Sequence, residues 1–151
     1  MTTLNEILSA RTVAKYATES GTKMHALLQH IVIDDKVERG DAELVSKIKR
    51  IPELVPFFSA SSRTEVPVAG TINGRFISRR IDRLCINHKQ KHIDIIDYKT
   101  DIDHDKFYSQ YSTQLREYCE LLRAIYPDYS ISAYILWTHD FSLEKIAYKQ
   151  V

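Results

Sequence analysis

The residues best suited to catalysis lie in the segment Ile93-Asp94-Ile95-Ile96-Asp97-Tyr98-Lys99-Thr100. Alternate residues of a strand share a face, so we expect Asp97 and Lys99 to point the same way as Ile93 and Ile95. A carboxylate and an ammonium group would then end a face that is otherwise apolar. An isolated Asp-x-Lys is more often a structural ion pair, so this motif needs further support before it predicts catalysis.

A second carboxylate, that of Asp82, lies on the preceding strand candidate. A hairpin joining the two strands would bring it close to Asp97. Two adjacent carboxylates repel each other unless a cation lies between them, and oxygen ligands with several retained waters are what Mg²⁺ prefers. Lys99 would then act on an attacking water or on the negative charge of a transition state. The alternative is that Asp82 merely forms an ion pair with Arg80 or Arg83.

Two predicted helices carry further polar residues. Gly21 and His25 are one helical turn apart, and a histidine beside an apolar helix face is more often a half-buried hydrogen-bonding residue than a metal ligand. Gln114 and Tyr118 are also one turn apart and can face the sheet together. The tyrosine has ordinary core spacing, but a buried glutamine must be hydrogen-bonded, so Gln114 indicates a polar partner.

The hydrophobic pattern predicts the elements that must hold these residues in place. Asp41 is the expected N-cap of a short helix, Pro127 stops a long helix whose apolar stripe includes Ile125, and a polar turn joins two of the strands. The predicted helices cover 22–37, 41–50 and 105–126, and the predicted strands cover 63–68, 75–86, 92–99, 130–138 and, at an edge, 143–148. A hairpin followed by a helical crossover implies an α/β fold with a mixed central sheet and helices packed against it.

The composition fits one globular domain covering residues 1–151, with 44% hydrophobic and 27% charged residues. No apolar run approaches the roughly 20 residues that span a bilayer, and the first ten residues lack the features of a secretory signal. We therefore expect a cytoplasmic protein with no membrane partner. Cys85 and Cys119 match no zinc or redox spacing, so they are expected to be free, buried thiols.

The formal net charge of +1 bears on possible nucleic-acid binding. A stand-alone DNA-binding protein usually carries a marked basic excess. If this chain acts on DNA, a partner or a local cluster of Arg75, Arg79, Arg80 and Arg83 must supply much of the affinity.

Taken together and in order, the motifs Gly-x-x-x-His, Ile-Asp-Arg-Leu, Asp-Tyr-Lys-Thr and Gln-Leu-x-x-Tyr resemble the nuclease domain of the RecB family. That family belongs to the PD-(D/E)xK superfamily, whose core order is αβββαβ. The resemblance implies a restriction-endonuclease-like core over about residues 19–146. The segments most similar to the C-terminal nuclease domains of AddA-type helicase–nuclease subunits are Arg80-Ile81-Asp82-Arg83-Leu84, Asp97-Tyr98-Lys99-Thr100, Ala124-Ile125-Tyr126-Pro127 and Leu136-Trp137-Thr138.

The resemblance implies a Mg²⁺-dependent deoxyribonuclease, an exonuclease linked to the repair and recombination of DNA double-strand breaks. Its expected partners are DNA and a helicase subunit or larger helicase–nuclease complex. Because one implied ligand is a histidine, Mn²⁺ is expected to substitute for Mg²⁺. The implied metal ligands are His25, Asp82, Asp97 and the Tyr98 carbonyl; the implied catalytic residues are Asp82, Asp97 and Lys99; and the residues implied to support the site and contact DNA are Gln114, Tyr118 and Glu65.

Two features depart from that family. Arg79 stands where a glycine often precedes the Ile-Asp pair, and no Gly-x-x-x-x-Gly-Lys-Ser/Thr motif of a helicase motor occurs in the sequence. One alternative is therefore a nuclease-like module that has lost activity and serves in DNA binding or assembly. A second alternative is a structural domain whose aspartates and lysines form ordinary ion pairs.

Overall fold

The chain is described by a computed structural model over residues 21–149, so the ends of the predicted domain, including residues 19 and 20 of its predicted core, lie outside the described residues. A helix covering residues 21–29 comes first. The elements that follow are β1 (Val32–Ile33), β2 (Glu38–Arg39), α2 (Ala42–Lys49), the 3-10 helix η1 (Val55–Phe58), β3 (Arg63–Ile72), β4 (Arg75–Asn87), β5 (His92–Lys99), α3 (His104–Ile125), β6 (Ser130–Trp137) and β7 (Ser142–Lys145).

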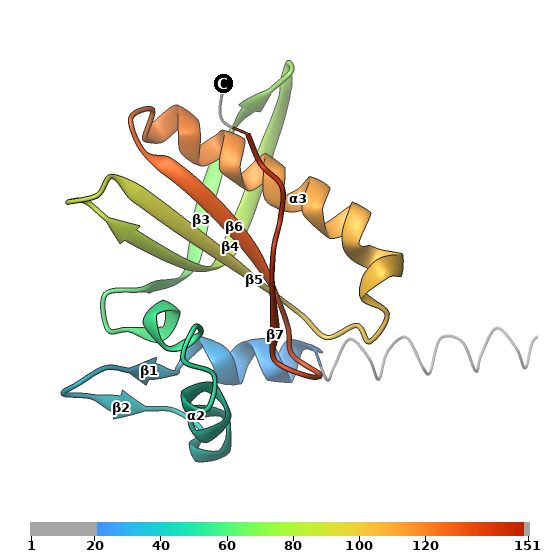
Figure 1. Ribbon diagram of the computed structural model, residues 1–151. Helices are drawn as coiled ribbons and strands as arrows, with labels where there is room; N and C mark the ends of the chain where they lie inside the picture. Colours follow the sequence, from blue (N-terminus) through green and yellow to red (C-terminus); the bar gives the residue numbers. More distant parts are fainter. Residues whose placement is uncertain (1–20, 150–151) are drawn as a thin grey trace, which may run out of the picture.

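The central sheet has five strands in the order β3-β4-β5-β6-β7. All neighbours are antiparallel except β5 and β6, which are parallel and joined by the crossover helix α3. Figure 1 shows α3 along one side of the sheet, with the first helix, β1, β2, α2 and η1 gathered at another. The chain therefore has the α/β fold with a mixed central sheet and flanking helices that the sequence predicts.

Strand β5 is central to the structure because both of its faces are buried. Ile93 and Ile95 pack in the apolar layer under α3, with residues such as Leu115. Ile96 and Tyr98 pack in the second layer, formed with the first helix, α2 and η1. Alternate side chains of a strand point to opposite faces, so one strand supplies both layers and places Asp97 on the α3 side.

Most predicted element ends are confirmed because local signals fix them. The Asp41 side chain accepts a hydrogen bond from the Leu44 N–H at the start of α2. Strand β3 continues to Ile72, beyond the predicted end at residue 68, and β7 is shorter than the predicted edge strand. Ile125, expected on the buried stripe of α3, is 55% exposed because it is the last helical residue, beyond the contacts made by Leu122.

The prediction of one helix over residues 22–37 is wrong in its second half. Helix ends at residue 29, and β1 and β2 form a two-stranded sheet. Val32 and Ile33 are β-branched and favour strand. The Asp34 carboxylate then accepts hydrogen bonds from the N–H groups of Lys36 and Val37, which forms the turn.

The two cysteines are free thiols, as expected, although only Cys119 is buried and Cys85 is half-buried. Burial raises the pKa of Cys85 to about 11 and that of Cys119 to about 12, so both thiols are unreactive at neutral pH. Within residues 21–149, no helix combines the length and apolar character needed to cross a membrane.

Arg83 is the most deeply buried charged side chain that the structure describes, at 1% exposure. It forms no salt bridge within residues 21–149; its guanidinium instead donates to the carbonyls of Leu28 and Ile31 at 2.9 and 3.1 Å. These carbonyls lie at and just after the end of the first helix, where a cation is favoured; the Leu28 carbonyl also accepts from the Ile31 N–H at 3.2 Å. The same guanidinium donates to the Tyr98 hydroxyl at 2.8 Å and the Ser62 hydroxyl at 2.6 Å. Arg83 therefore ties the first helix to β4, to β5 and to the loop before β3.

We expect Arg83→Met to lower the free energy of unfolding by about 3 kcal/mol or more, because each buried acceptor left without a donor costs about 1–3 kcal/mol. Arg80→Met is the matched control, since Arg80 lies on the same strand with its side chain 68% exposed, and it should change stability by about 0.5 kcal/mol or less. Chemical denaturation of both variants measures the difference. Equal losses would show that Arg83 does not hold the helix in place.

Candidate active site

The site forms where β4 and β5 separate. Backbone pairing between these strands runs from Asn87↔His92 to Arg83↔Ile96 and then stops. At the next position the Asp82 carboxylate accepts a hydrogen bond from the Tyr98 N–H at 2.8 Å, in place of a backbone carbonyl. The alternative prediction that Asp82 merely pairs with Arg80 or Arg83 is wrong, because Arg80 pairs with Glu65 and Arg83 binds the first helix.

Strand β4 is irregular at this point. Ile77, Ile81 and Leu84 all pack in the layer under α3, although strict alternation would place Leu84 on the face opposite Ile81. On the neighbouring strand, Glu65 has φ 54° and is skipped in the β3–β4 pairing, opposite Asp82. A glutamate in this backbone region is strained by about 1–3 kcal/mol, and such strain is concentrated at functional sites.

His25 faces Asp82 from the first helix. Its Nδ1 lies 2.8 Å from the Gly21 carbonyl, and its Nε2 lies 3.2 Å from Asp82 Oδ2. Because a carbonyl only accepts, Nδ1 carries a proton and Nε2 is the nitrogen directed at the site. The hydrogen bond to Asp82 raises the pKa of His25 to about 9, although burial opposes the shift. In the protein without metal, His25 is therefore positively charged at neutral pH.

The two aspartates have opposite pKa shifts. Asp97 is 4% exposed, and burial together with the nearby Asp82 raises its pKa to about 7, although Lys99 opposes the shift. Burial also acts to raise the pKa of Asp82, but hydrogen bonds from His25, the Asp97 carboxyl and the Tyr98 N–H lower it overall. At mildly acidic pH, a protonated Asp97 donates to an ionised Asp82, which relieves the repulsion between them.

Lys99 Nζ is held at the edge of this carboxylate pair. It lies 3.0 Å from Asp97 Oδ2 and 4.4 Å from the centre of the Tyr111 ring. It also donates to Gln114 Oε1 at 3.2 Å, while Gln114 Nε2 donates to the Tyr118 hydroxyl at 2.8 Å. The expected polar partner of Gln114 is therefore Lys99. Tyr118 is only 3% exposed, so in this arrangement it holds Gln114 and does not reach a substrate directly.

A pocket of about 520 Å³ opens above these groups, and its walls include residues that the sequence did not single out. Tyr111 donates a hydrogen bond to the Asp101 carboxylate, and both line the pocket. Asp101 follows Lys99 by two residues, and Tyr111 precedes Gln114 by three. Their closeness in sequence to the two motifs was the feature from which a place in the pocket could have been predicted. The predicted site residues in the walls are His25, Glu65, Asp82, Tyr98 and Lys99.

The donor atoms fit a divalent metal in three respects. His25 Nε2 and Asp82 Oδ2 are 3.2 Å apart, close to the roughly 3.0 Å that separates neighbouring ligands around an ion with bonds of about 2.1 Å. Asp97 Oδ2 is buried and receives no well-oriented hydrogen bond from residues 21–149, even though Lys99 Nζ is close. The N–H and carbonyl of a strand residue point to the same side, so the Tyr98 carbonyl faces the gap that contains Asp82.

The structure brings His25, Asp82, Asp97 and Lys99 together, but more loosely than a bound ion requires. Among residues 21–149, the ligand atoms of the first three do not all lie within 4.8 Å of one another. One side chain must therefore turn for all three to bind one ion. The sequence matches no protein-family model and no curated protein, so a functional proposal depends on the sequence motifs and on this geometry.

Without metal, we expect the protein to lose stability as the pH rises from about 5 to about 9. The raised pKa of Asp97, about 7, means that the folded protein holds a proton that the unfolded chain releases at lower pH. This stabilisation is lost as the pH passes about 7. The raised pKa of His25, about 9, gives a stabilisation that is complete below its ordinary value of 6.5 and is lost as the pH passes about 9. Thermal melts in EDTA measure the trend.

Two variants separate the contributions of Asp97 and His25 to this loss of stability. Asp97→Asn should remove the part that is complete by about pH 7, and His25→Gln the part that is complete by about pH 9. Mn²⁺ should reverse the trend in the unaltered protein, because metal ligands must be deprotonated and its affinity therefore rises with pH. A metal-free melting temperature that stays constant or rises over this range would contradict the assigned pKa shifts.

Proposed function

We propose that the chain is a metal-dependent DNA nuclease domain that hydrolyses phosphodiester bonds with Mg²⁺ or Mn²⁺. The observation that carries this proposal is the buried Asp97, which lies beside a second carboxylate and whose Oδ2 has no well-oriented hydrogen bond from the residues that the structure describes. His25 and Lys99 face the same open pocket. Strongly perturbed ionisable groups in a pocket are typical of active sites.

A purely structural ion pair accounts for less of this arrangement. An Asp97–Lys99 pair needs one carboxylate, whereas the site holds two. Asp82 raises the pKa of Asp97, and the hydrogen bond from the Asp97 carboxyl lowers the pKa of Asp82. The charged His25 offsets Asp82 in the metal-free protein, but Asp97 is 4% exposed and keeps a raised pKa beside Lys99, so its ionised form still carries a free-energy cost. A divalent ion between His25, Asp82, Asp97 and the Tyr98 carbonyl would offset that cost.

The residues of the chain would divide the work in the following way. A bound divalent ion supplies Lewis acidity for the phosphate and lowers the pKa of an attacking water. Gln114 holds the Lys99 ammonium against Asp97 at the wall of the pocket. From there Lys99 would orient the attacking water or offset negative charge that develops on the phosphate. Tyr118 keeps Gln114 in place, and Glu65 at the pocket wall would limit how the substrate enters.

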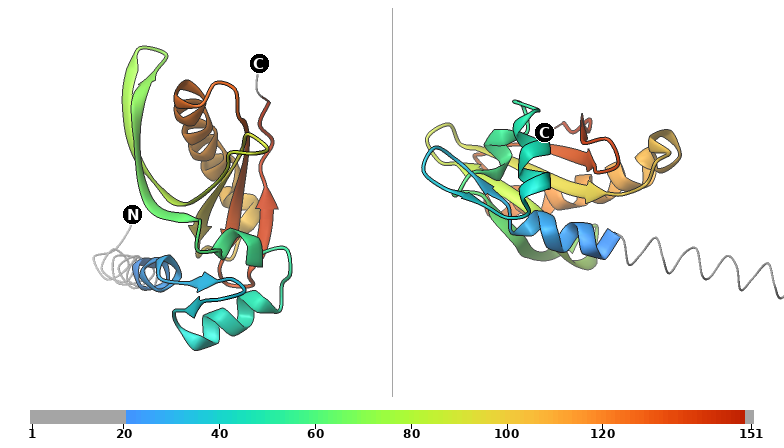
Figure 2. Two further views of the ribbon diagram at one scale, coloured as in Figure 1. Left: turned by 90° about the vertical axis from the view of Figure 1, so that its left-hand side faces the viewer. Right: turned by 90° about the horizontal axis from the view of Figure 1, so that it is seen from below.

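The surface charges indicate that the isolated chain would bind DNA weakly. Figure 2 shows the β3–β4 hairpin curving away from the rest of the sheet. Its arginines are partly neutralised, because Arg75 and Arg79 pair with Glu117 at 3.6 and 3.8 Å. Arg83 is buried and does not belong to the expected basic cluster.

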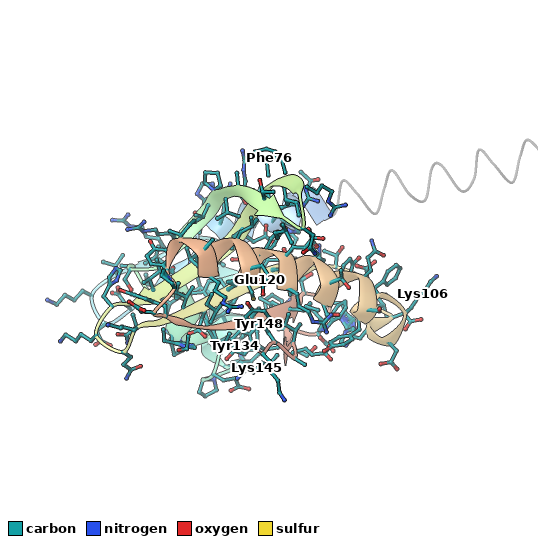
Figure 3. All side chains as sticks on the ribbon, turned by 90° about the horizontal axis from the view of Figure 1, so that it is seen from above. Phe76, Lys106, Glu120, Tyr134, Lys145 and Tyr148 are labelled. Atoms are coloured by element: carbon teal, nitrogen blue, oxygen red, sulfur yellow. The ribbon has the colours of Figure 1, made fainter. Side chains whose placement is uncertain are left out.

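Phe76, 70% exposed, projects from the end of the hairpin (Figure 3) and gives an apolar side chain that can stack on a base. A helicase subunit or larger helicase–nuclease complex, acting in the cytoplasm on DNA breaks, would supply the remaining affinity. The proposed activity is exonucleolytic.

Lys99→Ala and Asp97→Ala separate catalysis from metal binding. We expect Lys99→Ala to lower the rate of cleavage of linear DNA by about 100-fold or more. Metal affinity should stay nearly unchanged, because Lys99 acts on water and phosphate and not on the ion. Asp97→Ala should abolish both cleavage and metal affinity, because it removes a ligand. The assays are digestion of linear single- and double-stranded DNA with Mg²⁺ or Mn²⁺, and metal titration by calorimetry.

Other outcomes would contradict the proposal in distinct ways. Stoichiometric metal binding to the unaltered protein without cleavage of either DNA would favour a nuclease-like module that has lost activity. If both variants lose about 3–5 kcal/mol of stability and no metal shifts any melting curve, Asp97 and Lys99 are a buried structural pair.

DNA binding by the isolated chain should be weak and steeply dependent on salt, because the net charge is only +1 and the exposed arginines act locally. Arg80→Ala should weaken binding. It should also lower the slope of the logarithm of affinity against the logarithm of salt concentration by about one, the amount expected for one lost phosphate contact. Lys145→Ala is the control, since Lys145 is exposed on β7 (Figure 3) at the far edge of the sheet from β4. Fluorescence anisotropy at several salt concentrations measures both. Tight binding that hardly changes with salt would contradict this expectation.

A further inference from the structure

A second group of potential metal ligands lies outside the pocket described above. His104 is the first residue of α3, and His139 and Asp140 are neighbours in the turn between β6 and β7. One ligand atom from each of these three residues lies within 4.8 Å of the other two. The parallel pairing of β5 and β6 brings the loop after β5 and the turn after β6 to the same edge of the sheet, which places these residues together.

The His104 side chain is held in one orientation, and one of its nitrogens finds no partner in the described part of the chain. Its ring stacks on the indole of Trp137, with centroids 4.1 Å apart and an angle of 11° between the planes. Its Nε2 is buried and has no hydrogen-bond partner among residues 21–149. A buried nitrogen without a partner costs free energy, and a metal bound at this nitrogen would remove that cost.

The two turn residues have a spacing suited to a tetrahedral ion. His139 Nδ1 and Asp140 Oδ1 are 3.3 Å apart, and two ligands with bonds of about 2.0–2.1 Å in a tetrahedral site are separated by about 3.3 Å. The Ser142 N–H and hydroxyl both donate to Asp140 Oδ1, which fixes the carboxylate. His139 also lines a pocket of about 400 Å³, so solvent can reach this group of residues.

We propose that His104, His139 and Asp140 bind a transition-metal ion of the Zn²⁺ class, with water as a fourth ligand. Two imidazoles and one carboxylate suit Zn²⁺ or Co²⁺, whereas Mg²⁺ prefers oxygen ligands. The ion would link the first turn of α3 to the β6–β7 turn. This site is distinct from the proposed nuclease site and does not depend on nuclease activity.

Trp137 provides a direct test, because it is the only tryptophan in the chain and contacts His104. Co²⁺, a paramagnetic substitute for Zn²⁺, should quench Trp137 fluorescence in the full chain, and Zn²⁺ should prevent the quenching. His139→Ala and Asp140→Asn should each raise the Co²⁺ concentration needed for quenching by at least about tenfold. His30→Ala is the control, since His30 is an exposed histidine outside the group, and should leave quenching unchanged.

A second variant distinguishes the two metal sites. In Asp82→Asn/Asp97→Asn, which impairs the proposed nuclease site, quenching by Co²⁺ and its prevention by Zn²⁺ should persist at unchanged concentrations. Zn²⁺ at about 100 times its Kd should also raise the melting temperature of that variant by about 5 °C or more. Three results would overturn the inference: Co²⁺ does not quench Trp137 fluorescence, the fluorescence of His139→Ala is quenched at the same Co²⁺ concentration as that of the unaltered protein, or quenching is lost in Asp82→Asn/Asp97→Asn.

Discussion

The buried guanidinium of Arg83 is the interaction on which both the fold and the site depend. It joins the carbonyls of Leu28 and Ile31 to the hydroxyl of Tyr98 on β5. A guanidinium has five N–H donors in a fixed plane, so one side chain can hold the end of a helix against two strands. Because His25 lies less than one turn before Leu28, the position of this helix end sets the position of the His25 ring relative to Asp82.

The arrangement that would let the site bind a metal also destabilises the metal-free protein. Two carboxylates and a lysine are brought together where β4 and β5 separate, and the strained backbone at Glu65 lies directly opposite. In the absence of metal, burial and the neighbouring Asp82 raise the pKa of Asp97, and the hydrogen bond to Asp82 raises that of His25. The proton on Asp97 and the charge on His25 then reduce the repulsion between the carboxylates. A divalent cation would replace both protons, so metal binding and proton release are coupled in this arrangement.

Much of the fold and part of the site could be predicted from local sequence. Asp41 at the start of α2, the proline after α3 and the alternation of Ile93, Ile95 and Asp97 on β5 are signals carried by neighbouring residues. The helix predicted through residue 37 was wrong because the same apolar residues suit a helix face or a short strand, and the turn at Asp34 decides between them. The spacing of Gln114 and Tyr118 indicated a shared face, and Lys99 proved to be the glutamine's partner.

By itself, the sequence determined which side chains share a face, since the periods of helix and strand fix this within one element. Only the tertiary structure decided the partners across elements. It assigned Arg83 to the first helix rather than to Asp82, paired Arg75 and Arg79 with Glu117, and placed His104 beside His139. These contacts depend on how far the strands twist and where their pairing stops, and those properties arise from the packing of the whole sheet rather than from any short segment.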